Sequence, residues 1–175
     1  MTFEIHSDIT NRSMTIASRA MRRVLRRKRS IIWAIYGWSV FFINTLLLLI
    51  PFDGEPFTLD AGTVISLLVE VMLLSVLLFQ DRFNGMIACK NTLAGTKDYH
   101  ITFGEESYTV VTEVTTSTFR YELIDAMAES QDYMILLMKK RFAQPLDKRT
   151  LTGGTVEECK RFLEEKTGKK FRRVK

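Results

Sequence analysis

The sequence predicts an α+β fold in which a two-helix transmembrane hairpin carries a small antiparallel β-barrel or sandwich, capped by a C-terminal α-helix. The first observation is a long apolar block without basic residues: residues 30–79 hold four acidic residues and no Lys or Arg. The mean hydropathy of the 175 residues, +0.02, conceals this block. The second observation is that short alternating segments and polar turns follow from residue 98, and that an amphipathic helix ends the chain.

The first predicted span, residues 30–50, is 21 residues without a charge. As a helix it is about 32 Å long, enough to cross a hydrocarbon core of about 30 Å. The second span, residues 63–79, contains one acid, Glu70. A central acid costs about 3 kcal/mol, whereas the twelve Leu, Ile, Val and Phe residues of this span contribute about −4 to −7 kcal/mol, so insertion is favoured.

Two other interpretations of the apolar block are disfavoured. A buried hairpin in a soluble protein needs a larger surrounding chain, because both helices are apolar on every face. A cleavable signal peptide is disfavoured because the run starts at residue 30, is too long, and ends without a small-residue cleavage site.

The flanking charges predict the orientation of the hairpin. Seven of the eleven residues 19–29 are basic, whereas the connecting loop 51–62 carries only acidic charges. The positive-inside rule therefore places both termini in the cytoplasm and the loop outside. Cys89 and Cys159 then lie in the cytoplasmic part, where we expect reduced thiols.

Residues 1–29 form the predicted N-terminal segment. It starts with a short strand near Thr2–His6, and one helix is expected to run from about Asn11 to Ile50. Its basic cluster has three interpretations: anchoring at the inner leaflet, recognition of anionic lipids, or nucleic-acid binding. The last is disfavoured because no aromatic residues for base stacking are interleaved. The cluster comprises Arg22, Arg23, Arg26, Arg27, Lys28 and Arg29.

Residues 80–97 are predicted to extend the second helix out of the membrane, 98–168 to form the cytoplasmic domain, and 169–175 to be a basic tail. Residues 133–138 are apolar on both faces, which predicts a central strand, and Pro145 predicts an edge strand. Thr155 and Glu158 form a capping box, and Gly168 marks the end of the final helix. The expected strands are 99–103, 108–112, 119–123 with a continuation over 124–129, 133–138 and 142–146.

This organisation resembles the YcxB-like membrane proteins of bacteria. The resemblance lies in the strand and turn patterns Tyr99–Phe103, Tyr108–Thr112, Phe119–Ile124 and Glu129–Leu136, with Pro145 ahead of the final helix. It implies a bacterial cytoplasmic (inner) membrane location and a cytoplasmic domain similar to pleckstrin-homology (PH) domains. The sequence departs from the family pattern where Leu146 and Asp147 separate Pro145 from Lys148-Arg149. The family suggests no established activity.

The sequence predicts no enzyme. His6 and His100 have no Cys, His or carboxylate neighbours at metal-ligand spacing, so neither a metal site nor a cofactor is expected. Gly153-Gly154 lacks the Lys-Ser/Thr of a phosphate-binding loop, and no serine has the context of a nucleophile elbow.

Glu70 is the intramembrane residue with a candidate role. The positions of Asn44 and Glu70 are both about 9–10 Å below the outer helix ends, so antiparallel packing brings them to similar depth. We expect a protonated Glu70 that is hydrogen-bonded to Asn44 or Thr45 and holds the hairpin together. A contact between two copies and an ion or proton path are the alternatives.

A second basic group comprises Lys139, Lys140, Arg141, Lys148 and Arg149. It is interpreted either as a solubilising rim attracted to the inner leaflet or as a surface for an acidic lipid or protein partner. The predicted function is a non-enzymatic platform for protein or anionic-lipid interaction, with a homo-oligomer as one possible assembly. The alternative is a small subunit of a transport complex in which Glu70 lines a polar path; flux assays with Glu70→Gln would distinguish the two.

Overall fold

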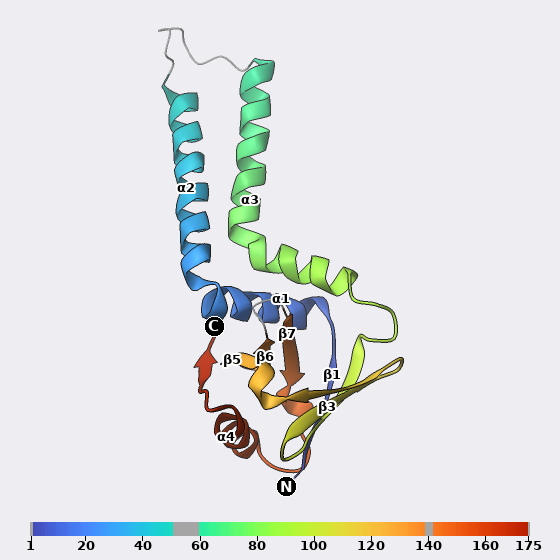
Figure 1. The fold of residues 1–175 in the computed structure, drawn as a ribbon. Coiled ribbons are helices and arrows are strands. Elements are labelled where there is room, and N and C mark those ends of the chain that lie inside the picture. The colour runs from blue at the N-terminus through green and yellow to red at the C-terminus, as the bar shows by residue number, and fades with distance from the viewer. Residues whose placement is uncertain (1, 51–59, 139–141, 175) are drawn as a thin grey trace.

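The computed structural model describes residues 2–50, 60–138 and 142–174. Two long helices stand side by side, and a head of two β-sheets and shorter helices lies at one end of them (Figure 1). The N- and C-termini both lie in the head, at the end of the hairpin opposite the connection between the long helices. The predicted α+β class is confirmed, but the described residues form two separate sheets and no closed barrel.

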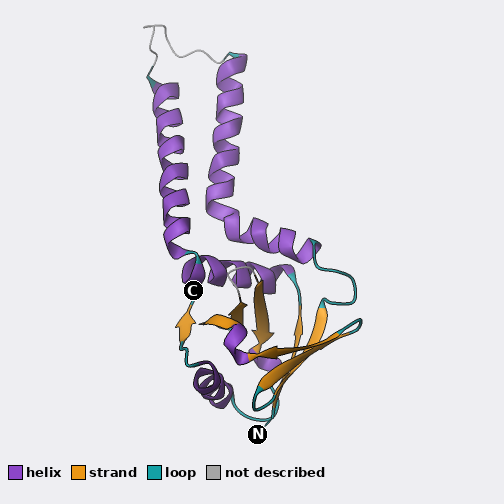
Figure 2. Cartoon of the chain, viewed as in Figure 1, coloured by secondary structure: helices purple, strands orange, loops and turns teal. Residues whose placement is uncertain are grey.

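Helices and strands are both present along the chain, and Figure 2 distinguishes them by colour. In chain order, the elements are β1 (Phe3–Asp8), α1 (Asn11–Ala20), a π-helical segment (Met21–Leu25), α2 (Arg27–Leu49), α3 (Ala61–Lys90), β2 (Asp98–Phe103), β3 (Ser107–Thr112), β4 (Thr116–Arg120), a 3-10 helix (Tyr121–Leu123), β5 (Ile124–Glu129), β6 (Tyr133–Met138), β7 (Phe142–Asp147), a 3-10 helix (Lys148–Thr150), α4 (Val156–Thr167) and β8 (Phe171–Arg173).

Helices α2 and α3 are each long and apolar enough to cross a membrane. Gly37 is the buried residue of α2, and the first buried residue of α3 is Asp81, so the apolar side chains of both helices need a nonpolar solvent. The Asp60 side chain caps α3 by accepting a hydrogen bond from the Thr63 amide at 2.8 Å. Leu77 of α3 packs directly onto Gly37 of α2, where the missing side chain allows close approach.

The prediction of a single helix over residues 11–50 is wrong, because this range is divided into α1, the π-helical segment and α2. After α1 the backbone widens into the π-helical segment, and Arg26 leaves helical geometry with φ −109° and ψ 22°. Consequently α1 lies across the base of the hairpin rather than in line with α2 (Figure 1). The reason is tertiary: Ala17 and Ala20 are fully covered in packing between α1 and the head, which requires the chain to turn before it enters the hairpin.

Helix α3 bends at Phe79, where φ is −110° and ψ is 15°. Beyond the bend, residues 80–90 turn away from α2 and run alongside α1; we call these residues the lower arm of α3 (Figure 1). The bend coincides with a change of composition, because the first polar and charged residues after the apolar block are Gln80, Asp81 and Arg82.

The head consists of one sheet in the order β1-β2-β3-β4 and another in the order β7-β6-β5-β8. Their facing sides share one buried core, which includes Ile5, Phe103 and Tyr108 from the first sheet and Met127 and Leu136 from the second. Cys159 and Leu163 of α4 belong to the same core. Thr155 and Glu158 form the predicted capping box, and Gly168 ends the helix in the left-handed conformation, which confirms both signals.

The opposite face of the second sheet packs against α1. Ile135 and Leu137 of β6 join Ala17, Ala20 and Met21 in a second buried cluster. All six residues of β6 are buried, and β6 lies between β5 and β7. The prediction of a central strand apolar on both faces is therefore confirmed, as is the edge position of the Pro145 strand, β7.

The strand pattern differs from the prediction at two places. The third strand ends at Arg120, and Tyr121–Leu123 form a 3-10 helix from which the Tyr121 hydroxyl donates a hydrogen bond to the Gly104 carbonyl at 2.7 Å. Residues 169–175, predicted as a basic tail, contain the strand β8, which pairs in parallel with β5. The tail side of this pairing is three residues long and charged at two of them, so no alternating pattern marks it as a strand.

The close crossing of α1 and the lower arm generates a prediction for Gly85→Ala. An added Cβ would lie 2.5 Å from the Thr15 amide nitrogen and 2.6 Å from its Cα, so the two helices must separate. We expect a loss of about 1–3 kcal/mol of stability. Thermal unfolding in detergent measures this loss, and separation should also accelerate maleimide labelling of Cys89, whose thiol lies 3.7 Å from the Ile9 carbonyl oxygen.

Gly62→Ala is the matched control, because its added Cβ would come no closer than 3.5 Å to a neighbouring side chain. Cys159 provides an internal reference for labelling: burial raises the pKa of its thiol to about 12, so it stays unreactive while the head is folded. Equal unfolding temperatures and labelling rates for Gly85→Ala and Gly62→Ala would contradict the proposed tight crossing.

Candidate functional site

The intramembrane acid lies against the other helix of the hairpin. The Glu70 carboxyl contacts the Thr45 hydroxyl, which is one of the two partners predicted for it. Thr45 Oγ1 also donates to the Phe41 carbonyl at 2.9 Å. Because a hydroxyl has one hydrogen, Thr45 donates it to only one of these two acceptors at a time. Asn44, the other predicted partner, is half-buried on α2 and is not the residue that contacts Glu70.

The basic cluster of residues 22–29 does not act as one surface. Arg22 turns inward and binds Asp81 of the lower arm through two nitrogens, with Nε at 2.7 Å from Oδ1. Arg19 Nε lies 3.6 Å from the same carboxylate. The hydrogen bond with Asp81 raises the pKa of Arg22, against the opposing effect of partial burial. An acid of the same chain therefore binds Arg22, which was predicted to face the membrane or an acidic partner, and that prediction stays untested.

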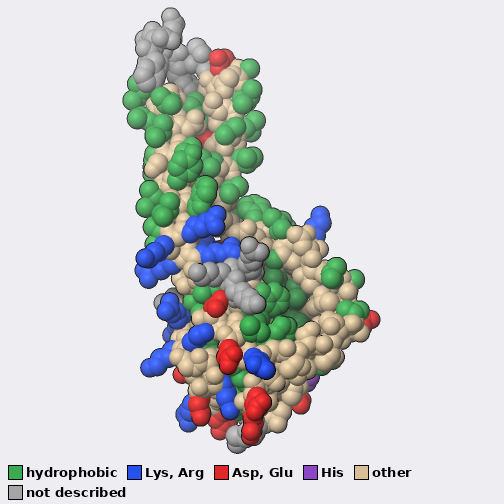
Figure 3. Space-filling view, viewed as in Figure 1, with side chains coloured by type: hydrophobic (Ala, Val, Ile, Leu, Met, Phe, Trp, Pro, Cys, Tyr) green, Lys and Arg blue, Asp and Glu red, His purple; other side chains and the backbone are tan. Residues whose placement is uncertain are grey.

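The remaining members of the cluster are exposed and gather just below the apolar hairpin (Figure 3). Arg26 and Arg29 line a hollow of about 500 Å³ between the start of α2, α1 and the lower arm, into which Arg22 also projects. Arg23 and Arg27 line a neighbouring hollow of about 370 Å³. Lys28 lies on the exposed surface of α2.

The lower arm of α3 is amphipathic in a way that the sequence analysis missed. Asp81 and Gly85 are buried on the side facing α1. On the other side, Phe83, Met86 and Ile87 are 40%, 49% and 54% exposed. A helix with one apolar face exposed next to a membrane span is typical of a segment lying in the interface. The prediction that residues 80–97 extend the second helix out of the membrane left this face out, although the spacing of the three apolar residues indicates it.

The second basic group is largely engaged within the head. Lys148, which is only 14% exposed, donates to Glu129 Oε1 at 2.6 Å and to the Ser130 carbonyl at 2.7 Å. Arg149 binds Asp147 through its side chain. Lys148 is therefore mostly covered by the head, whereas the side chain of Arg149 is 67% exposed, and the prediction that these two residues face a partner stays a prediction. Lys139, Lys140 and Arg141, which belong to the same expectation, lie outside the described residues.

Glu129 joins three elements of the head. Its two carboxylate oxygens accept from Lys148 and, at 2.6 Å, from Lys160 of α4. Partial burial acts to raise the pKa of Glu129, but the hydrogen bonds from the two lysines outweigh it and hold the pKa below its usual range.

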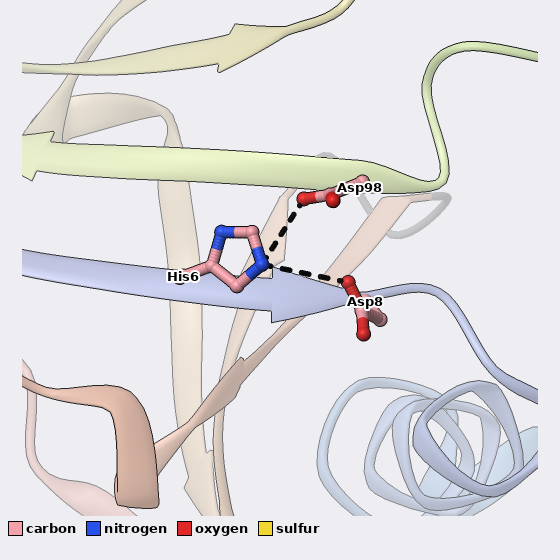
Figure 4. A group of neighbouring side chains, drawn as sticks. All are labelled: His6, Asp8 and Asp98. Carbon is pink, nitrogen blue, oxygen red and sulfur yellow. Dashed lines mark ion pairs between the residues drawn. The ribbon is translucent and has the colours of Figure 1, made fainter.

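The two histidines come together although they are far apart in the sequence. The pairing of β1 with β2 places His6 opposite His100. His6 Nε2 lies 3.3 Å from Asp98 Oδ1 and 3.8 Å from Asp8 Oδ1 (Figure 4). Ligand atoms of these three residues lie within 4.8 Å of one another. Asp98 reaches His6 from the neighbouring strand and Asp8 from two residues along the same strand, and all three side chains are more than half exposed.

A family model described as "YcxB-like protein" matches residues 103–163, from the end of β2 into α4. The match confirms the resemblance inferred from the strand and turn patterns over this part of the chain. No curated protein and no solved structure matches the chain.

The Glu70–Thr45 contact predicts that Thr45→Val weakens packing of the hairpin. Valine keeps the shape but removes the hydroxyl, so Glu70 loses its partner. We expect a loss of about 0.5–2 kcal/mol. Reversible unfolding in mixed micelles measures it, and a double-mutant cycle with Glu70→Leu isolates the pair. Ser75→Ala is the control, because Ser75 bonds only the carbonyl of its own helix, at Val71. A coupling energy indistinguishable from zero would show that the contact contributes nothing.

The lowered pKa of Glu129 predicts a pH-dependent stability. Stabilisation from this carboxylate is present above its unfolded-state pKa of about 4.3 and disappears as the pH falls through the lower folded-state value. We expect Glu129→Gln to destabilise the head by about 1–2 kcal/mol at pH 7, because two lysines lose their charged acceptor. Urea unfolding at several pH values should show the difference from wild type shrinking below about pH 4.3. Glu122→Gln, at an exposed position, should show neither effect. A difference that persists unchanged at low pH would contradict the assignment.

Proposed function

We propose that this chain is a non-enzymatic, multi-pass protein of the bacterial cytoplasmic membrane. In this proposal, α2 and α3 cross the bilayer, both termini are cytoplasmic, and a PH-like head is held at the inner surface for interaction with a protein or anionic-lipid partner. The family match and the two apolar helices support the membrane location.

The observation that carries the proposal is the rigid connection between hairpin and head. Helix α1 packs along the lower arm through Gly85, and the Arg22–Asp81 ion pair joins the π-helical segment that follows α1 to the same arm. The same α1 packs on the second sheet through Ala17 and Ala20. A head attached by packed helices, rather than by a flexible linker, presents a defined face toward the cytoplasm.

The exposed apolar side of the lower arm supports the same orientation. Phe83, Met86 and Ile87 extend the exposed apolar surface of α3 beyond its bend at Phe79. When the hairpin crosses the bilayer, these side chains enter the interface, and the basic residues at the base of α2 lie at the level of the head groups. Basic residues on this side favour the cytoplasmic leaflet.

Polar groups of the head support an interaction role rather than catalysis. Lys148 and Lys160 both donate to Glu129. The hydroxyl of the buried Ser7 accepts a hydrogen bond from the Asp147 amide at 2.8 Å, which joins β1 to β7. These groups join strands and helices of the head and do not converge on an open cleft.

Topology mapping tests the membrane arrangement. Epitope tags at both ends should be accessible to protease only in inside-out vesicles, and the protein should resist extraction by alkaline carbonate. A nitroxide on Ile87→Cys, in a Cys89→Ser background, should sense lipid-soluble oxygen, whereas one on Arg161→Cys of α4 should not. Termini on opposite sides of the membrane, or release of the protein by carbonate, would overturn the proposal.

Site-specific photo-crosslinking tests the interaction role. A photoreactive residue at Glu122 or Arg161, both exposed on the head, should give a discrete crosslinked product in living cells. The same residue at Tyr36 or Leu68, on the apolar helices, is the control and should react with lipid. A head whose exposed positions yield no discrete product would count against an interaction platform.

A further inference from the structure

We propose that the 500 Å³ hollow between the hairpin and the head binds the head group of an anionic glycerophospholipid of the inner leaflet. This inference rests on the proposed function, because the hollow meets lipid only if the hairpin crosses the membrane. It extends that function by naming one site and one class of ligand.

The position of the hollow matches the head-group level of a bilayer. Above it, α2 and α3 are in contact where Leu77 packs on Gly37. Below this contact α3 bends at Phe79 and separates from α2, and the hollow lies in the space between. Arg29 is the last basic residue before the apolar block, and Trp33 lines the hollow one turn further on, where a tryptophan favours the interface.

The charges that line the hollow are of one sign. Its charged lining residues are Arg22, Arg26 and Arg29, and no acidic side chain of the described residues lines it. Asp81 compensates the charge of Arg22 from behind. Arg26, at the break before α2, and Arg29, in the first turn of α2, are both exposed and both line the hollow. Guanidinium groups bind phosphate oxygens through two parallel hydrogen bonds, so this lining suits a phosphodiester.

The other lining residues suit the rest of such a head group. Ser30, Gln80 and Asn84 offer hydrogen-bonding groups for glycerol hydroxyls, while Met14 and Met21 provide an apolar wall. The volume is within the range of about 300–1,000 Å³ that small-molecule sites occupy. Basic pockets between membrane helices on the cytoplasmic side bind acidic head groups in general. A zwitterionic lipid would place its ammonium group among the arginines, so the site selects a net negative charge.

Lipid titration of the detergent-purified full chain, followed by native mass spectrometry, tests the proposal. Phosphatidylglycerol should bind more tightly than phosphatidylethanolamine. The double substitution Arg26→Gln/Arg29→Gln should lower the affinity for phosphatidylglycerol about tenfold or more, because two charge-assisted contacts are lost. The control Arg120→Gln/Arg161→Gln removes the same charge from exposed positions on β4 and α4 and should change the affinity less than about twofold.

A second variant keeps the test decisive if the double substitution disturbs folding. Asn84→Trp fills the hollow without changing its charge and should also weaken phosphatidylglycerol binding. Unchanged binding in both variants, an equal loss in the control, or displacement of the lipid by soluble glycerol 3-phosphate would overturn the lipid site. Release of the wild-type protein by carbonate would instead overturn the proposed membrane location. A protein that stays membrane-bound while the variants bind phosphatidylglycerol normally refutes the lipid site alone.

Discussion

The attachment of α1 to the lower arm of α3 is the contact on which the arrangement of the molecule depends. Asp81 is nearly buried and accepts from Arg22 through two nitrogens, while Gly85 lets the Thr15 backbone approach to a distance that excludes any side chain. A buried ion pair contributes little net stability, because desolvation of both groups offsets their attraction. Its value here is geometric: the two hydrogen bonds from Arg22 and the close approach at Gly85 together fix how the head lies against the hairpin.

That contact explains both interruptions of the long helices. For α1 to lie along the lower arm, the first helix must break at Arg26, and α3 must bend at Phe79. Together the two changes of direction separate α2 from the lower arm below the Leu77–Gly37 contact. The hollow is the consequence of this separation. The bend also directs Phe83 and Ile87 outward, so one deformation supplies both a basic hollow and an apolar face at the same side of the head.

The elements that could be predicted from the sequence are those whose signals are local. The apolar block marked α2 and α3, the double-sided apolar run marked β6, and Thr155 with Glu158 marked the start of α4. The break at Arg26 could not be predicted, because no Gly or Pro accompanies it and its cause is packing of Ala17 and Ala20 on a sheet far along the chain. Strand β8 was missed for the same reason: its two arginines show no strand pattern, and its backbone pairs with β5, which lies more than 40 residues earlier in the chain.

The basic residues show the same limit most clearly, because a sequence displays their neighbours but not the acids that other elements bring to them. Arg22 belongs to a basic cluster, yet its partner Asp81 is 59 residues away. Lys148 follows an expected edge strand, yet it binds Glu129 of β5. In each case the basic side chain forms an ion pair with an acid of another element of the same chain, and this pair joins the two elements. The proposed lipid site rests on a different observation, because Arg26 and Arg29 line a hollow to which the described residues contribute no acidic side chain. An anionic head group that enters it would therefore meet only positive charge among the described side chains that line it.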